Sequence, residues 1–139
     1  MQGRQFLDLA KQLLHGGTEA HWRGAAGRAY YALMLECREA LSRWGIPSPP
    51  RLNVHTFVRL RFSYPVDADL KFIGTALDEL GQLRNKADYD LSPLPHFASA
   101  SAPGNAVQQA TMALQRLDVI HADPVRRAAA IAAIRKAFP

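Results

Sequence analysis

The chain is poor in cysteine and has no long apolar run, and each absence excludes a class of structure. Cys37 is the only cysteine among 139 residues, which excludes an internal disulfide and a zinc site built from cysteines. No apolar run approaches the roughly 20 residues that span a bilayer, and the first residues lack the apolar core of a signal peptide. We therefore expect a soluble cytoplasmic protein without membrane association.

The sequence also lacks the short motifs of several enzyme classes. It contains no glycine-rich phosphate loop, no nucleophile elbow and no carboxylate-rich metal motif. His15, Glu19 and His21 are potential metal ligands, but Gly16 and Gly17 interrupt the helical geometry that would bring them together. We expect no bound metal ion and no cofactor.

Most of the basic residues are arginines. The sequence holds 13 arginines and 4 lysines, and its net charge is +5. Because arginine makes planar, two-point contacts with phosphates, this excess is compatible with an RNA or nucleotide partner; we predict no DNA partner. Four basic residues on the last predicted helix are interpreted as a solvated surface, with a phosphate-contacting patch as the alternative: Arg126, Arg127, Arg135 and Lys136.

Helical periodicity dominates the chain and predicts one all-α domain over residues 1–139. The composition, 48% hydrophobic and 21% charged, is that of a globular domain, and a chain of this length can bury an independent core. Apolar stripes predict helices over residues 6–14, 18–44, 54–62, 70–91, 107–120 and 124–138. We expect a bundle of four to five main helices, in which the second and fourth of these segments are two long antiparallel central helices.

Capping and breaking residues mark several boundaries. Thr18 is a good N-cap, and Asp123 followed by Pro124 is a typical helix start. The Ser/Ala/Pro/Gly stretch 98–104 is predicted to be a mobile loop. Residues 57–62 alternate with the period of a strand, but we favour a helix because no pairing partner lies nearby.

The most informative stretch is 83–90, LRNKADYD, near the end of the predicted helix 70–91. Apolar or small residues recur every three or four positions along this helix: Leu70, Ile73, Leu77, Leu80, Ala87 and Leu91. Arg84 falls on the same core-facing side, where a guanidinium needs either a partner or a cleft. Asp88 lies one turn later and can pair with Arg84, and Asn85 and Tyr89 have the same spacing.

These polar residues have a structural and a functional interpretation. Arg84 and Asp88 are either an ion pair that locks the helix into the bundle or part of a site. His55 is either a structural hydrogen-bonding group or a catalyst. Tyr30 lies on an apolar stripe and is predicted to be a core residue, and Cys37 on the same stripe is predicted to be a buried thiol.

The segment 27–34, GRAYYALM, in the first long helix resembles a signature of the HEPN superfamily, in its small prokaryotic branch. Three further features agree with this resemblance. His55 and Phe57 follow a proline-rich loop, and the last helix has an alanine-rich face. The remaining feature is a polar cluster near the end of the second long helix: Arg84, Asn85, Asp88 and Tyr89. The resemblance covers roughly residues 2–121.

This resemblance implies a helical bundle that usually forms a homodimer. It also implies frequent pairing with a minimal nucleotidyltransferase in a toxin–antitoxin or defence module. In related pairs the transferase modifies a tyrosine near the site, for which Tyr89 is the candidate here. The other candidate binding residues are Arg28 and Tyr31 on the facing helix, His55, and Lys86.

Many HEPN proteins are metal-independent ribonucleases that use an arginine, a polar residue and a histidine four to six residues further on. Here Asp88, Tyr89, Asp90 and Leu91 occupy the histidine positions, and His96 comes too late. Histidine is the natural proton-transfer group near neutral pH, and an ionised aspartate would repel an RNA phosphate. We therefore predict a binding or regulatory component associated with RNA or a nucleotide. The alternative is a ribonuclease toxin with a substitute base, whose catalytic candidates are Arg84, Asn85 and Asp88.

Overall fold

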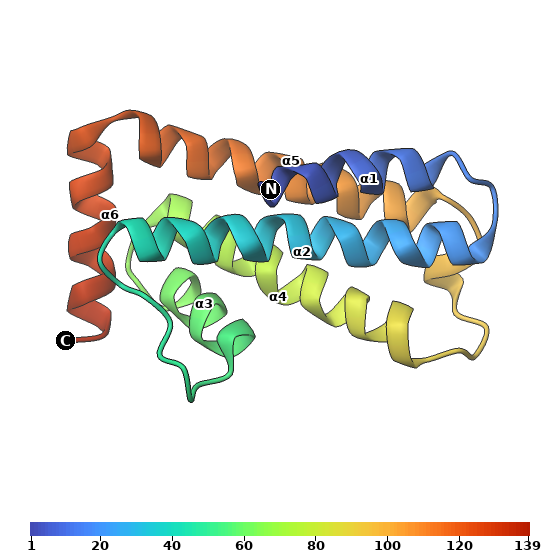
Figure 1. The fold of residues 1–139 in the computed structure, drawn as a ribbon, viewed down its shortest axis with the longest axis horizontal. Coiled ribbons are helices and arrows are strands. Elements are labelled where there is room, and N and C mark those ends of the chain that lie inside the picture. The colour runs from blue at the N-terminus through green and yellow to red at the C-terminus, as the bar shows by residue number, and fades with distance from the viewer.

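Six α-helices and one short 3₁₀ helix form the chain in a computed structural model, which describes residues 1–139 (Figure 1). They are α1 (Arg4–Leu14), α2 (Glu19–Arg43), α3 (Val54–Ser63), α4 (Ala68–Tyr89), the 3₁₀ helix η1 (Pro95–Phe97), α5 (Ser101–Ala122) and α6 (Pro124–Ala137). No strand is present, which confirms the predicted all-α fold. The segment 57–62, which alternates like a strand, lies within α3.

Helix α2 lies at the centre of the bundle and packs against α1, α4 and α5. Figure 1 shows α1 and α4 antiparallel to α2, whereas α5 runs parallel to it. Helix α3 packs against α4, and α6 crosses one end of the bundle. The antiparallel pair α2 and α4 agrees with the prediction. However, α5 has 22 residues and equals α4 in length, so the bundle has three long helices instead of two.

Small residues on α2 let the neighbouring helices approach closely. Five of its alanines are fully buried: Ala25, Ala26, Ala29, Ala32 and Ala40. Larger side chains from the surrounding helices fill the space between them, among them Phe62 of α3, Leu70 of α4 and Ile120 of α5. Cys37 lies in this core, as predicted, and burial raises the pKa of its thiol.

The apolar stripe of α4 faces the core as predicted, with one exception. Its buried members are Leu70, Ile73, Leu77, Leu80 and Ala87. Leu91 was predicted to belong to the stripe, but its side chain is 83% exposed. The reason is that α4 ends at Tyr89 and the chain continues through Asp90 in an extended conformation.

Side-chain caps begin four of the helices, α2, α3, α4 and α6. The hydroxyl of Thr18 accepts a hydrogen bond from the His21 amide at the start of α2, and the carboxylate of Asp123 accepts one from Val125 at the start of α6. Both predicted N-caps are thus confirmed. At the start of α4, Asp67 caps the helix in the same way.

The prediction of a loop over residues 98–104 is wrong for residues 101–104, because α5 begins at Ser101. Pro103 and Gly104 therefore lie in the first turn of a helix. The amide groups of a first turn have no partner within the helix, so a proline at this place removes no hydrogen bond. The proline and glycine of this segment are typical of a loop, and for this reason the start of α5 was not predicted.

The basic side of α6 is not entirely solvated, contrary to the prediction. Arg126 binds the carboxylates of Asp67 and Asp69 at distances of 2.7 and 2.9 Å. Because α6 crosses the end of the bundle where α4 begins, this arginine joins the two helices. Arg135 and Lys136 remain exposed.

A close approach between α3 and α4 depends on Gly74. A Cβ atom at this position would lie 2.7 Å from both the Cα and the backbone nitrogen of Ser63. No side chain fits there without moving α3, so the glycine sets the distance between these helices. Every helix of the fold falls short of the length and hydrophobicity that a bilayer-spanning segment needs.

Candidate functional site

A polar cavity of about 410 Å³ opens between α3 and α4, with Tyr30 of α2 in its lining. We call it the Arg84 cavity. It brings together three of the residues singled out from the sequence, His55 of α3 and Arg84 and Asn85 of α4. These residues are about 30 positions apart along the chain, and the antiparallel packing of α3 on α4 makes them neighbours.

The guanidinium of Arg84 is held in place by its neighbours. One terminal nitrogen donates to the hydroxyl of Tyr31, and the other donates to Oδ1 of Asn85 over 3.2 Å. Its Nε lies 2.9 Å from Oδ2 of Asp88, in an ion pair without hydrogen-bond alignment. A guanidinium has five N–H groups. Each terminal nitrogen therefore keeps one N–H for a ligand.

Both interpretations of Arg84 are therefore compatible with its surroundings. The side chain is 18% exposed and pairs with Asp88, as a structural ion pair requires. The same side chain lines the cavity, as a binding residue requires. Asp88 lies outside the cavity lining, so its negative charge is not presented directly to a ligand there.

The ring of His55 is oriented by Tyr30. The hydroxyl of Tyr30 lies 2.6 Å from Nδ1 of His55, and the two rings stack with centroids 5.7 Å apart. Tyr30 is buried, as predicted for a core residue, yet its hydroxyl reaches the cavity lining. Nε2 of His55 has no partner in the protein and is the nitrogen left for a ligand.

Burial and charge shift the pKa values of this pair in ways that keep it neutral. Burial, followed by the neighbouring Tyr31, raises the pKa of Tyr30 to about 12. Burial and the positive charge of Arg84 lower the pKa of His55 below its ordinary value of 6.5. At neutral pH the neutral pair has two tautomers, in which Nε2 of His55 either donates a hydrogen bond or carries a lone pair.

Two amide side chains of the cavity have free N–H groups. Oδ1 of Asn85 accepts from Arg84, and Oδ1 of Asn53 caps α3 by accepting from the amides of His55 and Thr56. With both oxygens engaged, each side chain retains its NH₂ group as a donor. Asn53 was not identified from the sequence, although its place after the proline-rich loop is a capping signal.

Arg59 is the other cation of the cavity, and sequence reasoning missed it. It lies one turn after His55 on α3 and has no ion pair or hydrogen-bond partner in the protein. The signal that could have found it is the helical spacing of Asn53, Thr56 and Arg59, which places them on one side of α3. Asp78 is the only carboxylate among the lining residues.

Three other predicted residues surround the cavity without lining it. The guanidinium of Arg84 lies 5.4 Å from the ring of Tyr89, which is 74% exposed. Arg28 lies 5.2 Å from the ring of Tyr31, the residue that binds Arg84. Tyr31 thus connects both arginines.

Lys86 does not join this group. It lies two residues after Arg84, which turns its side chain about 200° around α4. It lines a separate cavity on the side of α4 that faces α5, together with Leu83 and His96. The structure places no group of three or more His, Cys, Asp or Glu side chains in an arrangement that could hold a metal ion.

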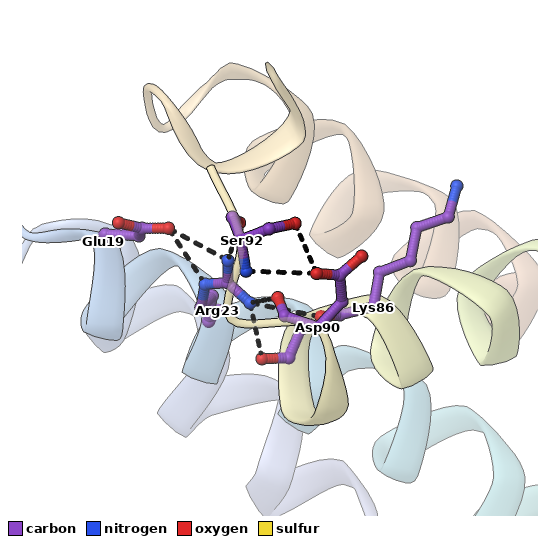
Figure 2. A network of polar contacts seen from close by, with 6 residues as sticks. Glu19, Arg23, Lys86, Asp90 and Ser92 are labelled. Atoms are coloured by element: carbon purple, nitrogen blue, oxygen red, sulfur yellow. Dashed lines mark hydrogen bonds and ion pairs between the residues drawn. The ribbon is translucent and has the colours of Figure 1, made fainter. Parts of the chain in front are cut away.

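Arg23 fixes the end of the helix that carries Arg84 (Figure 2). From the facing helix α2 its guanidinium donates to four backbone carbonyls at the end of α4 and just beyond it, at distances of 2.6 to 3.1 Å: Lys86, Ala87, Asp90 and Ser92. Glu19 pairs with the same side chain, and the ring of Phe97 lies 4.7 Å from it. Arg23 thus binds the C-terminal end of α4 from another helix, and it was not identified from the sequence.

The arrangement suits an anion with several oxygen atoms. Two guanidinium groups, two amide NH₂ groups and one histidine nitrogen are gathered around one cavity, against a single carboxylate. Comparison with known proteins found no matching family, no similar curated protein and no similar solved structure.

Proposed function

We propose that the chain is a HEPN-type protein that binds RNA or a nucleotide through a phosphate group in the Arg84 cavity. The observation that carries this proposal is that the fixed guanidinium of Arg84 and the unpaired Arg59 line one cavity. Planar guanidinium groups with free N–H groups are the preferred protein partners of phosphate. His55 and Asn85 supply further donors at the same place.

The biological module to which the protein belongs is proposed from the sequence resemblance alone. In it the protein is a binding or regulatory component of a prokaryotic toxin–antitoxin or defence module. It forms a homodimer and pairs with a nucleotidyltransferase, and the exposed ring of Tyr89 is accessible to such a modifying enzyme. Mass determination of the protein after incubation with a nucleotidyltransferase partner and ATP tests this setting.

Replacement of Arg84 by alanine is expected to weaken RNA binding by at least tenfold. A charge-assisted hydrogen bond contributes about 1.5–3 kcal/mol, and each 1.4 kcal/mol corresponds to a factor of ten in affinity. The measurement is fluorescence anisotropy with a labelled single-stranded RNA. Arg43→Ala, which removes the same charge from the exposed end of α2, is the matched control. Equal affinities of the two variants would contradict the proposal.

A second candidate function is metal-independent cleavage of RNA, because His55 lies in the same cavity as Arg84 and Asn85. The substitute base that the sequence left unassigned is then His55. Its Nε2 would accept the proton of a ribose 2′-hydroxyl as this oxygen attacks phosphorus. The bond to the 5′-oxygen breaks, and water protonates the leaving oxygen. The products are a 2′,3′-cyclic phosphate and a 5′-hydroxyl.

If His55 is the base, cleavage is expected to rise with pH and to level off at a lower pH than an ordinary histidine would give, because burial and Arg84 lower the pKa of His55. Only the neutral ring accepts a proton. The measurement is the rate of cleavage of total RNA and tRNA, without metal, at pH values below and above 6.5. His55→Gln should reduce the rate at least 100-fold, the usual contribution of a general base. Full activity of His55→Gln would exclude this role.

A further inference from the structure

We infer that the Arg84 cavity is one end of a longer groove, whose ligand is a single strand of RNA several nucleotides long. This inference rests on the proposed function and names the form of its ligand. A mononucleotide would fill one cavity, whereas a strand would occupy the whole groove between α3 and α4.

The first observation is a second cavity that continues the first. It has a volume of about 330 Å³, no hydrophobic side chain lines it, and it shares Arg59 and Asp78 with the Arg84 cavity. Helix α3 lines both cavities, from Asn53 at its start to Ser63 at its end. We call the combined feature the α3–α4 groove.

The second observation is the distribution of positive charge along the α3–α4 groove. Arg84 lies at one end, Arg59 in the shared middle part and Lys71 at the other end. Nζ of Lys71 donates to the carbonyl of Ser63 over 3.1 Å and has no carboxylate partner. An ammonium group has three N–H groups, so two of them remain for a ligand.

The distance along α4 between Lys71 and Arg84 suits a strand better than a single nucleotide. Lys71 and Arg84 are 13 residues apart on α4, which corresponds to about 20 Å at a rise of 1.5 Å per residue. About six stacked nucleotides of one strand cover this length at 3.4 Å each. Grooves that follow a single strand typically bind about 4–16 nucleotides.

The lining also indicates how such a strand would be bound. Tyr30 is the only Phe, Tyr or Trp side chain in it, and its ring is buried against His55. The groove therefore offers no row of aromatic rings on which bases could stack. Contacts with the sugar–phosphate backbone would dominate, and the affinity would depend on salt more than on base sequence.

The α3–α4 groove contains two carboxylates, and replacing one of them tests whether the ligand is negatively charged. Asp78 lies where the two cavities meet and accepts a hydrogen bond from Gln82, and Glu79 accepts one from Gln109. A strand of phosphates would be repelled by Asp78, so Asp78→Asn should tighten its binding. A cationic ligand would respond in the opposite way.

The experiment compares a labelled uridine dinucleotide with a labelled uridine octanucleotide by fluorescence anisotropy at several salt concentrations. We expect the octanucleotide to bind at least tenfold more tightly. Lys71→Ala should weaken octanucleotide binding about threefold or more, reduce its salt dependence by about 0.7 in the log–log slope, and leave dinucleotide binding unchanged. Lys11→Ala removes the same charge from the exposed side of α1 and should change neither.

Four results would overturn the inference. The first is equal affinity for the two oligonucleotides, and the second is a Lys71→Ala variant that behaves like Lys11→Ala. The third is equal affinity for a duplex of the same length, and the fourth is weaker octanucleotide binding by Asp78→Asn.

If both oligonucleotides bind equally and Arg84→Ala abolishes this binding, the proposed function is supported and the extended groove is excluded. If neither oligonucleotide binds, both proposals fail. Because Lys71 is exposed and Asp78 is only partly buried, these variants are expected to fold.

Discussion

Replacement of Arg23 by alanine is expected to lower the free energy of unfolding by about 3 kcal/mol. Its side chain is only 11% exposed, and it binds four backbone carbonyls at the end of α4 and beyond. Removing one partner from a buried hydrogen-bond network leaves the remaining groups without compensation for their lost water. In the Arg23→Ala variant those groups are the four carbonyls.

Thermal unfolding followed by circular dichroism measures this effect. For a domain of this size, about 3 kcal/mol corresponds to a Tm lower by on the order of 10 °C. Arg43→Ala is the matched control, because Arg43 lies at the exposed end of the same helix and makes no ion pair or hydrogen bond. Its expected effect is within about 0.5 kcal/mol. Similar Tm values for both variants would show that Arg23 does not hold the end of α4.

Arg23→Lys distinguishes the charge of this residue from its shape. Lysine keeps the positive charge, but one ammonium group has three N–H groups at a single point. It cannot reach all four carbonyls and Glu19 at once. We expect the Arg23→Lys variant to recover less than half of the stability lost in Arg23→Ala. Full recovery would mean that charge alone explains the effect.

Substitution of Gly74 by alanine is expected to destabilise the fold by about 2–3 kcal/mol. The new Cβ atom would lie 2.7 Å from backbone atoms of Ser63, far inside ordinary contact distance. Because those atoms belong to the backbone, no rotation of a side chain relieves the clash. Helix α3 must therefore move away from α4, and the α3–α4 groove must widen with it.

Gly104→Ala is a matched control with the opposite expected sign. Gly104 also lies in a long helix, but no atom would come within 4 Å of its new Cβ atom. Alanine is favoured over glycine in a helix by up to about 1 kcal/mol, so this variant should be slightly more stable than the wild type. Urea denaturation of both variants gives the comparison. Stabilisation by Gly74→Ala would contradict the close packing of α3 on α4.

Local sequence patterns predicted the helices well, because each depends on neighbours in the chain. The stripe of α4 and the caps Thr18 and Asp123 can be recognised from spacing alone. The errors arose where the chain leaves a helix. Leu91 continues the spacing of α4 but lies beyond its end, and Pro103 looks like a loop residue although it starts α5.

Only some residues of the candidate site could be predicted from the sequence, for a different reason. Arg84 and Asn85 could be singled out because a polar group interrupts an apolar stripe. Arg59 and Asn53 could not, because their importance depends on how α3 packs against α4. Arg126 illustrates the same point, since its partners Asp67 and Asp69 lie more than 50 residues away in the sequence. Charges paired across helices have no local signature.

The contacts of Arg23 also affect the order in which the chain can assemble. They connect residues that are 63 to 69 positions apart, so forming them requires closure of a large loop. Long-range contacts of this kind slow folding and form only when distant segments have already met. The last turn of α4, which carries Asp88 and Tyr89, is therefore stabilised only after α2 and α4 have docked. A partly folded or newly synthesised chain that ends before residue 92 would lack this stabilisation, and the Arg84 cavity would be complete only in the finished bundle.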